Sequence, residues 1–148
     1  MKSRQKDIIF GRRVRQLMSE KSYAPEDVER LTGIPRESVE IWVSPEHVNN
    51  ADTVRSNLAA LCGVFGCSAG YILGASDDRG AFRPHKPEAF VPLLYTVLAR
   101  YGKTLHGMFG KTHIADNHMR VWKTGGEPLA SDIFTLSHYI GCTPDELI

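Results

Sequence analysis

Apolar residues recur along the chain at the spacing of helices that bury one face, and no run alternates as a strand would. The clearest run falls within 90–101 and consists of Phe90, Leu93, Leu94, Val97, Leu98 and Tyr101. A weaker version falls within 10–18 and consists of Phe10, Val14, Leu17 and Met18. The pattern therefore predicts an all-α protein.

Local signals predict where the next helices begin and end. Pro25 is favoured in a first helical turn, and the acidic residues that follow it suit the positive end of a helix. This second helix should end near Gly33, and a third helix should bury Ile34, Val39 and Trp42. A fourth helix should use Val54, Leu58, Leu61 and Phe65 and close at Gly66, before a short fifth helix at 71–73.

The chain repeats itself. IPRESVEIW (34–42) and IADNHMRVW (114–122) share their apolar positions, and an offset of 80 aligns the chain without a gap from Phe10 to Trp42. After the tryptophans the offset is 75, which pairs the fourth helix with Leu129, Ile133, Leu136 and Ile140. The five-residue difference lies between SPEHVNNAD and KTGGEP, which we interpret as a polar loop that tolerates a length change.

Two divergent copies of one five-helix domain follow from this register. We place the first copy at 1–75, a linker rich in turn residues at 76–87, and the second copy at 88–148. Gly107 and Gly110 weaken the second helix of the second copy, so this copy is expected to be degenerate. Its fourth helix should close at Gly141, and its fifth helix should span 144–148.

Composition narrows the class of protein. The chain of 148 residues has 18 basic and 17 acidic residues, no run of 18 apolar residues, and a first segment (1–15) too charged for a signal-peptide core. We therefore expect a cytoplasmic protein without a membrane segment. Cys62, Cys67 and Cys142 lack paired metal spacing, and the last two share one repeat position, which is typical of small core residues.

Enzyme chemistry finds no support in the motifs. The glycines at 107, 110, 125 and 126 lack the strand-turn-helix context of a phosphate-binding loop, and HExxH is absent. His113 and His118 are five residues apart, a poor spacing for two metal ligands on one helical face. We predict no catalytic site, metal or cofactor.

The helix pattern resembles the phage-repressor and Cro-like (XRE) helix-turn-helix family in both copies. The residues that carry the resemblance in the first copy are Val28, Leu31, Thr32, Gly33, Ile34, Val39 and Trp42. In the second copy they are Met108, Thr112, Ile114, Met119, Trp122, Gly125 and Pro128. The resemblance implies two tandem five-helix lambda-repressor-like domains, in which the third helix of each copy enters the major groove of DNA.

Mapped residue by residue, the resemblance implies which side chains would meet DNA. Positions that would reach base edges are Pro35, Arg36, Glu37 and Ile41 in the first copy, and Ala115, Asp116, Asn117 and Val121 in the second. Ser38 and His118 on the same helices would also contact DNA. Positions that would contact phosphate are Lys2, Arg4, Lys6, Arg12, Arg13, Arg15, Lys111, Arg120 and Lys123. The expected function is a sequence-specific double-stranded DNA-binding transcription regulator of phage or bacterial repressor type.

An alternative remains open. The overall charge is nearly balanced, and the third helix of the first copy pairs Glu37 and Glu40 with a single Arg36. Family members often carry Gln or Ser at the start of the second helix, where this chain has Ala24-Pro25 and Thr104-Leu105. The same fold could therefore serve as a protein-interaction or antirepressor module without direct DNA contact.

The two copies should also differ in assembly. Their outward residues on the third helix differ, so the pair could not read a palindrome, and we expect a homodimer that uses the same copy from each chain. We expect the first copy to read DNA. The basic residues Arg12, Arg13 and Arg15 give way in the second copy to Pro92, Leu93 and Tyr95, a surface that suits a partner.

Overall fold

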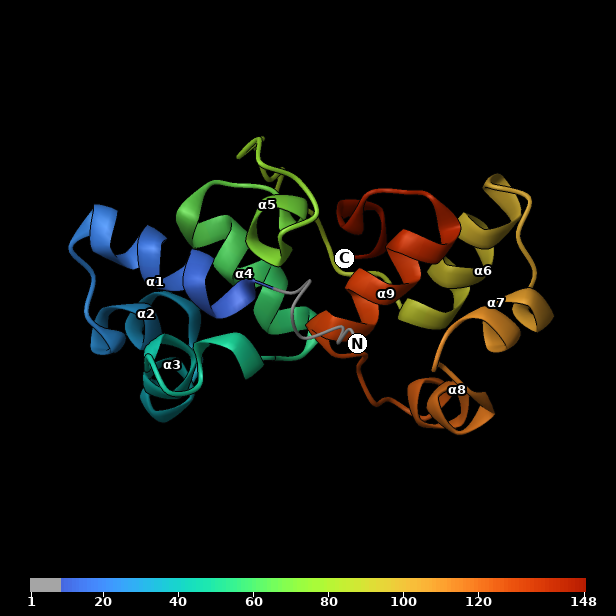
Figure 1. Cartoon of the computed structure of the whole chain (residues 1–148), viewed down its shortest axis with the longest axis horizontal. Helices are drawn as coiled ribbons and strands as arrows, with labels where there is room; N and C mark the ends of the chain where they lie inside the picture. Colours follow the sequence, from blue (N-terminus) through green and yellow to red (C-terminus); the bar gives the residue numbers. More distant parts are fainter. Residues whose placement is uncertain (1–8) are drawn as a thin grey trace.

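The computed structural model describes residues 9–148, and its helices fall into two successive sets in the same order (Figure 1). The first set is α1 (Phe10–Lys21), α2 (Pro25–Thr32), α3 (Arg36–Val43), the short 3-10 helix η2 (Val48–Asn50), α4 (Arg55–Phe65) and α5 (Ala69–Leu73). The second set is α6 (Phe90–Arg100), α7 (Leu105–Lys111), α8 (Asp116–Lys123), α9 (Ala130–Ile140) and the 3-10 helix η3 (Pro144–Leu147). The all-α class is confirmed for the described residues, and none of their helices is long and apolar enough to cross a membrane.

The turn before the third helix has the same construction in both sets. The Thr32 hydroxyl donates to the Val28 carbonyl at 2.6 Å and accepts from the Ile34 amide at 3.1 Å. Thr112 makes the equivalent pair of bonds to Met108 and Ile114, at 2.8 and 3.1 Å. The repeated threonine therefore sets the angle at which α3 and α8 leave the preceding helix.

The core of each half is centred on a tryptophan. Trp42 lies edge-on to Phe10 with ring centroids 5.2 Å apart, and Trp122 lies edge-on to Phe90 at 5.1 Å. Both tryptophans are buried, as expected, and so are the matched apolar positions of α1 and α6. Because each Trp–Phe contact joins the first helix of its half to the third, it holds the third helix against the core.

Some apolar positions of the repeat lie outside the core. The residue before each tryptophan, Ile41 or Val121, is more than half exposed. Leu31 and Leu129 are also exposed. Helical periodicity places Ile41 and Val121 on the outer face of α3 and α8, where no other helix covers them.

The longer loop of the first half is not simply polar, which corrects the interpretation of SPEHVNNAD. Its residues Val48 and Ala51 are buried, and η2 packs against α1. The approach is so close that Gly11 faces the carbonyl oxygens of Trp42 and Val48. The additional residues therefore form part of the core of the first half.

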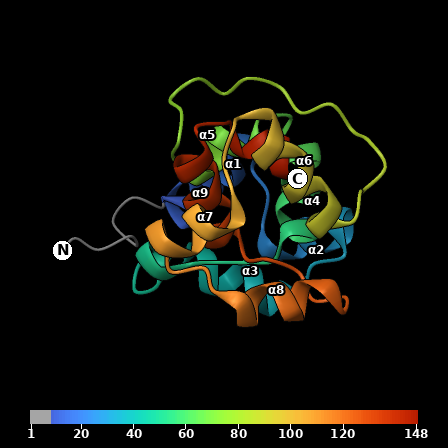
Figure 2. The same ribbon diagram turned by 90° about the vertical axis from the view of Figure 1, so that its right-hand side faces the viewer.

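The two halves pack through α4 and α5 of the first and α9 and η3 of the second, and the segment between α5 and α6 runs along the side remote from α3 and α8 (Figure 2). The start of this segment is attached to the first half, because the Ser68 amide donates to the Arg79 carbonyl at 2.7 Å and Arg79 pairs with Glu20. The boundaries 1–75, 76–87 and 88–148 stay a prediction.

Candidate nucleic-acid interface

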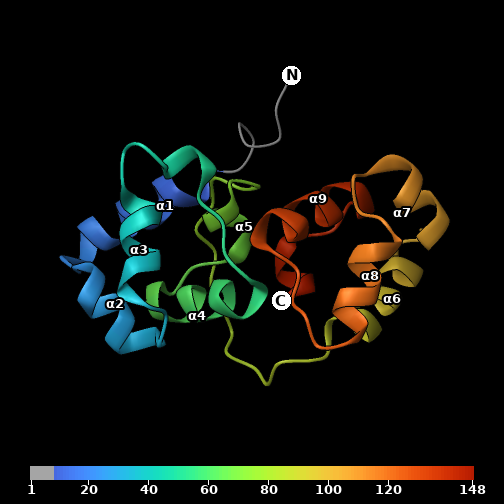
Figure 3. The ribbon, with the colours of Figure 1, turned by 90° about the horizontal axis from the view of Figure 1, so that it is seen from below.

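The third helices of the two halves, α3 and α8, lie on one face of the molecule. Figure 3 views this face directly and shows both helices in the foreground, with α4 and α9 between them. Each helix presents its first turn to solvent, because its buried residues, Val39 and Trp42 in α3 and Met119 and Trp122 in α8, all lie on the inner side. This face is the candidate interface.

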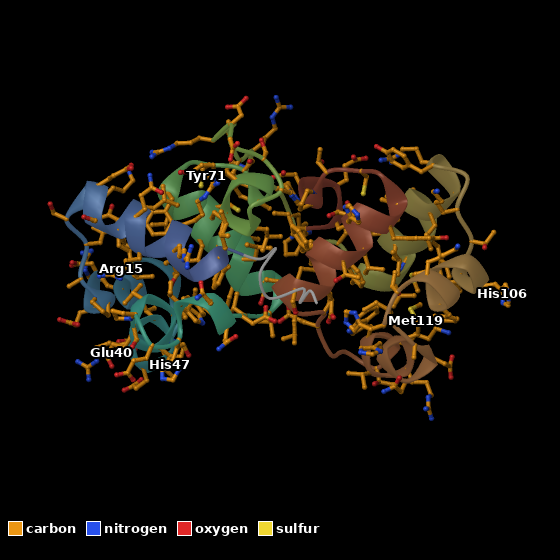
Figure 4. The ribbon with its side chains drawn as sticks, viewed as in Figure 1. Arg15, Glu40, His47, Tyr71, His106 and Met119 are labelled. Carbon is orange, nitrogen blue, oxygen red and sulfur yellow. The ribbon has the colours of Figure 1, made fainter. Side chains whose placement is uncertain are left out.

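The outer surface of α3 is rich in charge and carries one more acidic than basic residue. Arg36 and Glu37 are exposed in the first turn, and Ser38 is half-buried. The Arg36 guanidinium lies 4.0 Å from the Glu37 carboxylate and 3.9 Å from that of Glu40, which projects from the lower edge of the first half in Figure 4. Arg36 therefore has to leave acidic neighbours in order to reach another group.

The outer surface of α8 carries the same ion pair with its charges exchanged. Asp116 occupies the repeat position of Arg36, and Arg120 occupies that of Glu40, with Arg120 Nε 3.5 Å from the Asp116 carboxylate. Asn117 and Lys123 are exposed beside this pair. The two third helices therefore carry opposite charges at each of these two matched positions, and α8 is the more basic of the two.

His118, predicted to meet DNA, also makes local contacts within α8. Its Nδ1 atom accepts a hydrogen bond from the Ala115 amide at 3.0 Å, so the ring caps the first turn of α8, and it also packs at 5.8 Å from the Trp122 ring. A cap of this kind satisfies one of the free amides at a helix start. The half-buried ring is therefore a supporting group for α8.

Arg13 is not available to phosphate, contrary to the prediction. Its guanidinium donates to the carbonyls of Tyr71 and Ser76, pairs with Asp77 at 3.2 Å, and lies 4.1 Å from the centre of the Tyr71 ring. Only 13% of the side chain is exposed. Figure 4 places Tyr71 on the side of the molecule opposite Glu40, so Arg13 faces away from α3.

The other basic residues predicted on the first helix are better placed. Arg12 and Arg15 are exposed and line a shallow groove with Pro45 and Val48, next to the loop that follows α3 (Figure 4 labels Arg15). Lys2, Arg4 and Lys6 lie outside the described residues. Arg12 and Arg15 thus keep their place as candidate phosphate contacts.

Replacing Arg13 by alanine is expected to lower the free energy of unfolding by about 1–2 kcal/mol, because charged hydrogen bonds and a cation–π contact are lost. The dependence of DNA affinity on salt should stay unchanged. Urea unfolding and salt titration measure the two effects. Arg12→Ala is the matched control and should leave stability within about 0.5 kcal/mol. Unchanged stability with a flatter salt dependence in Arg13→Ala would return this residue to the DNA interface.

Three side chains of the second half could offer ligands to a metal. The potential ligand atoms of His113, His118 and Asp132 lie within 4.8 Å of one another. His113 lies in the turn before α8, so the two histidines do not share one helical face and their spacing in sequence is no objection to a site. These side chains are already engaged in contacts within the protein. Asp132 accepts from the Leu129 amide at 3.0 Å and lies 3.4 Å from His113 Nε2. His118 and Asp132 therefore cap α8 and α9, His113 contacts Asp132, and these bonds account for the arrangement without an ion.

The cysteines are poor nucleophiles. Burial raises the pKa of Cys67 and of Cys142 to about 11, and it raises the pKa of Cys62 as well. Because the thiolate is the reactive form, these thiols are suited to packing.

A set of contacts that sequence analysis missed joins the two halves beside α3 and α8. Asp52 and Glu127, which follow the third helix of their halves, accept hydrogen bonds from Ser131 and Ser56, which begin the fourth helix of the opposite halves. From sequence alone, an acidic residue four positions before a serine at a helix start would be interpreted as a cap of that same helix. The register reveals that these residues match at an offset of 75, but it does not reveal that the bonds cross between halves.

Comparison with known proteins identifies the first half. The family described as Cro/C1-type HTH DNA-binding domain matches residues 13–78, which is less than half of the chain. The first half therefore contains one Cro/C1-type helix-turn-helix domain, a type of domain that binds DNA and is typically non-enzymatic. The family does not match the second half. No curated protein and no solved structure matches the chain.

Proposed function

We propose that the protein is a sequence-specific double-stranded DNA-binding transcription regulator of repressor type that enters the major groove with α3. The observation that carries the proposal is the Cro/C1-type domain at 13–78, in which α3 presents an exposed first turn. An α-helix fits the major groove, and its first turn brings side chains to the base edges.

The second half is proposed to be a degenerate copy of the same domain. Its helices follow the same order, its threonine turn repeats that of the first half, and its Trp–Phe contact is equivalent. These features support a helix-turn-helix unit whose sequence has diverged beyond what the family comparison detects. In this proposal, α8 is a second helix able to enter a groove.

The side chains on the two helices suit different bases. Arg36 is suited to the guanine acceptors, Asn117 to adenine, and the carboxylates of Glu37 and Asp116 to the cytosine amino group. Arg12, Arg15, Lys111, Arg120 and Lys123 are exposed cations that would contact phosphate. The homodimer that uses one copy from each chain stays a prediction.

A protein-interaction or antirepressor role is the second candidate. The observation that favours it is the position of Arg36 between Glu37 and Glu40, which leaves α3 with an acidic surplus toward a polyanion. Salt dependence distinguishes the candidates, because DNA binding releases counterions from the phosphates and weakens as salt rises.

Affinity for a random-sequence duplex is expected to fall steeply with salt. Arg120→Ala combined with Lys123→Ala should flatten the plot of log affinity against log salt by about 2, since each lost phosphate contact removes about 0.9 from the slope. Fluorescence anisotropy at several salt concentrations measures this slope.

The matched control removes two cations from the remote segment, Arg83→Ala combined with Lys86→Ala, and should leave the slope unchanged. If the control pair flattens the slope as much as the α8 pair, a different face binds DNA. If the unsubstituted protein shows no affinity for duplex at low salt, the interaction role replaces the DNA-binding role.

A further inference from the structure

We infer that a single chain supplies both reading helices that two chains supply in a homodimer. In this arrangement, α3 and α8 of one molecule read two different half-sites on one side of a DNA duplex, in an operator without an inverted repeat. The inference rests on the proposed function. It follows from how the two halves contact each other.

Backbone bonds relate the halves by an approximate two-fold axis. The Arg55 amide donates to the Pro128 carbonyl at 2.9 Å, and the Ala130 amide donates to the Thr53 carbonyl at 2.6 Å. Arg55 matches Ala130, and Thr53 matches Pro128, at the offset of 75. Val54 and its match Leu129 form an antiparallel bridge between these bonds. Reciprocal contact between equivalent residues is the property of a two-fold interface.

The acid–serine contacts obey the same relation. Glu127 accepts from the Ser56 amide and hydroxyl, each at 2.8 Å, while Asp52 accepts from the Ser131 amide at 3.1 Å and from its hydroxyl. Each carboxylate thus lies at the positive end of the other half's fourth helix, which favours negative charge. Because Asp52 and Glu127 lie in the segments that leave α3 and α8, these bonds fix the positions of both third helices relative to each other.

Further contacts hold the same interface. The Asp145 carboxylate of η3 accepts from the Ala69 amide at 2.7 Å and from the Gly70 amide at 3.2 Å, at the start of α5. Arg55 is buried, and it donates to the carbonyls of Leu147 at 2.8 Å and Glu88 at 2.7 Å. The interface is therefore built from directional bonds as well as from apolar packing, which favours one fixed arrangement of the halves.

The consequence for DNA follows from the face on which α3 and α8 lie. Two-fold-related reading helices in a helix-turn-helix dimer meet half-sites about 34 Å, or one helical turn, apart on one side of the duplex. In this chain the helices are related in the same way, but their first turns differ: Arg36 and Glu37 stand where the second half has Asp116 and Asn117. Because α3 and α8 present different side chains, they require half-sites of different sequence.

The roles of the two halves then differ from the expectation that the first half reads DNA and the second assembles. The main contacts between the halves use α4, α5, α9 and η3, whereas Pro92 and Tyr95 of α6 stay exposed. The second half therefore both pairs with the first half and reads DNA. Pairing within the chain also removes the need for a second chain at the operator.

The test begins with duplexes selected from a random-sequence pool by the full chain. We expect two different half-sites, centred about 10 base pairs apart, bound by one chain per duplex in sedimentation. Randomising either half-site should weaken binding by about 100-fold, because the second contact is intramolecular. An insertion of about five base pairs turns one half-site to the far side and should weaken binding as much.

A protein variant tests the positioning role of the carboxylates. Asp52→Ala combined with Glu127→Ala should weaken binding to the two-part site by about 10-fold while affinity for a single half-site is kept, and the penalty for the five-base-pair insertion should shrink. Asp77→Ala combined with Asp78→Ala removes two negative charges from the segment between the halves, away from their interface, and should change neither affinity nor the insertion penalty. The DNA variants test the inference even where the protein variant unfolds.

The possible outcomes separate this inference from the proposed function. A selected palindrome that binds two chains would overturn the inference and restore the homodimer. A selected site with one half only, insensitive to the insertion, would overturn it while DNA binding stands. If no sequence is enriched and affinity shows no salt dependence, the proposed function fails as well.

Discussion

Replacing Trp42 by alanine is expected to lower the free energy of unfolding by about 3–5 kcal/mol, and replacing Trp122 should have an effect of the same size. Both indoles are buried at the junction of the first and third helices, and each loses an edge-on contact with a phenylalanine. Urea unfolding followed by circular dichroism measures the change.

The Trp42 variant should be the more damaging for the contact between halves. Trp42 Nε1 donates to the Asp52 carbonyl at 2.8 Å, and the side chain of the same Asp52 holds Ser131 of the second half. Tyr95→Ala is the control, because this aromatic ring on α6 is exposed and its loss should cost little. If either tryptophan variant unfolds at the same urea concentration as the parent, that indole is exposed and the position assigned to α3 or α8 is wrong.

Gly11→Ala is expected to destabilise the protein by about 1–3 kcal/mol or more, although alanine is the better helix former. A methyl group at this position would lie 2.7 Å from the Trp42 carbonyl oxygen and still closer to that of Val48. Both obstacles are backbone atoms, so α1 would have to move away from α3 and η2. Thermal unfolding measures the effect.

Gly63→Ala is the matched control within α4. A methyl group there would meet Phe82 at 3.8 Å, an ordinary contact, so the change should be neutral or stabilising by about 0.5–1 kcal/mol. If Gly11→Ala were as stable as Gly63→Ala, η2 would not press on α1. The corresponding position of the second half is Val91, where the shorter loop leaves room for a side chain.

The helices, the register of the repeat and the tryptophan cores could be predicted from the sequence because they depend on local spacing. Apolar periodicity reports which face of a helix is buried, and the two halves of the chain keep that face even where few residues are identical. The exposed first turns of α3 and α8 follow from the same periodicity, so Arg36, Glu37 and Asn117 lie on the outer surface as predicted.

Residue roles that depend on a distant partner could not be predicted in this way. Arg13 lies on the same helix as Arg12 and Arg15, yet its guanidinium is held by Tyr71 and by residues 76–77 on the far side. The loop after α3 has a polar composition, yet Val48 closes over Gly11. In both cases the deciding contact joins segments that only the packing of α1 against later helices brings together.

The sequence by itself determined that the chain is helical, that its pattern occurs twice, and which surfaces of the two third helices face outward. Only the tertiary structure decided how the two halves are oriented. Their relation depends on hydrogen bonds between residues more than 70 positions apart, such as Ser56 with Glu127 and Ser131 with Asp52. A repeat register shows that two residues are equivalent in position, but whether each contacts its own half or the other is settled by the packing of α4 and α5 against α9 and η3.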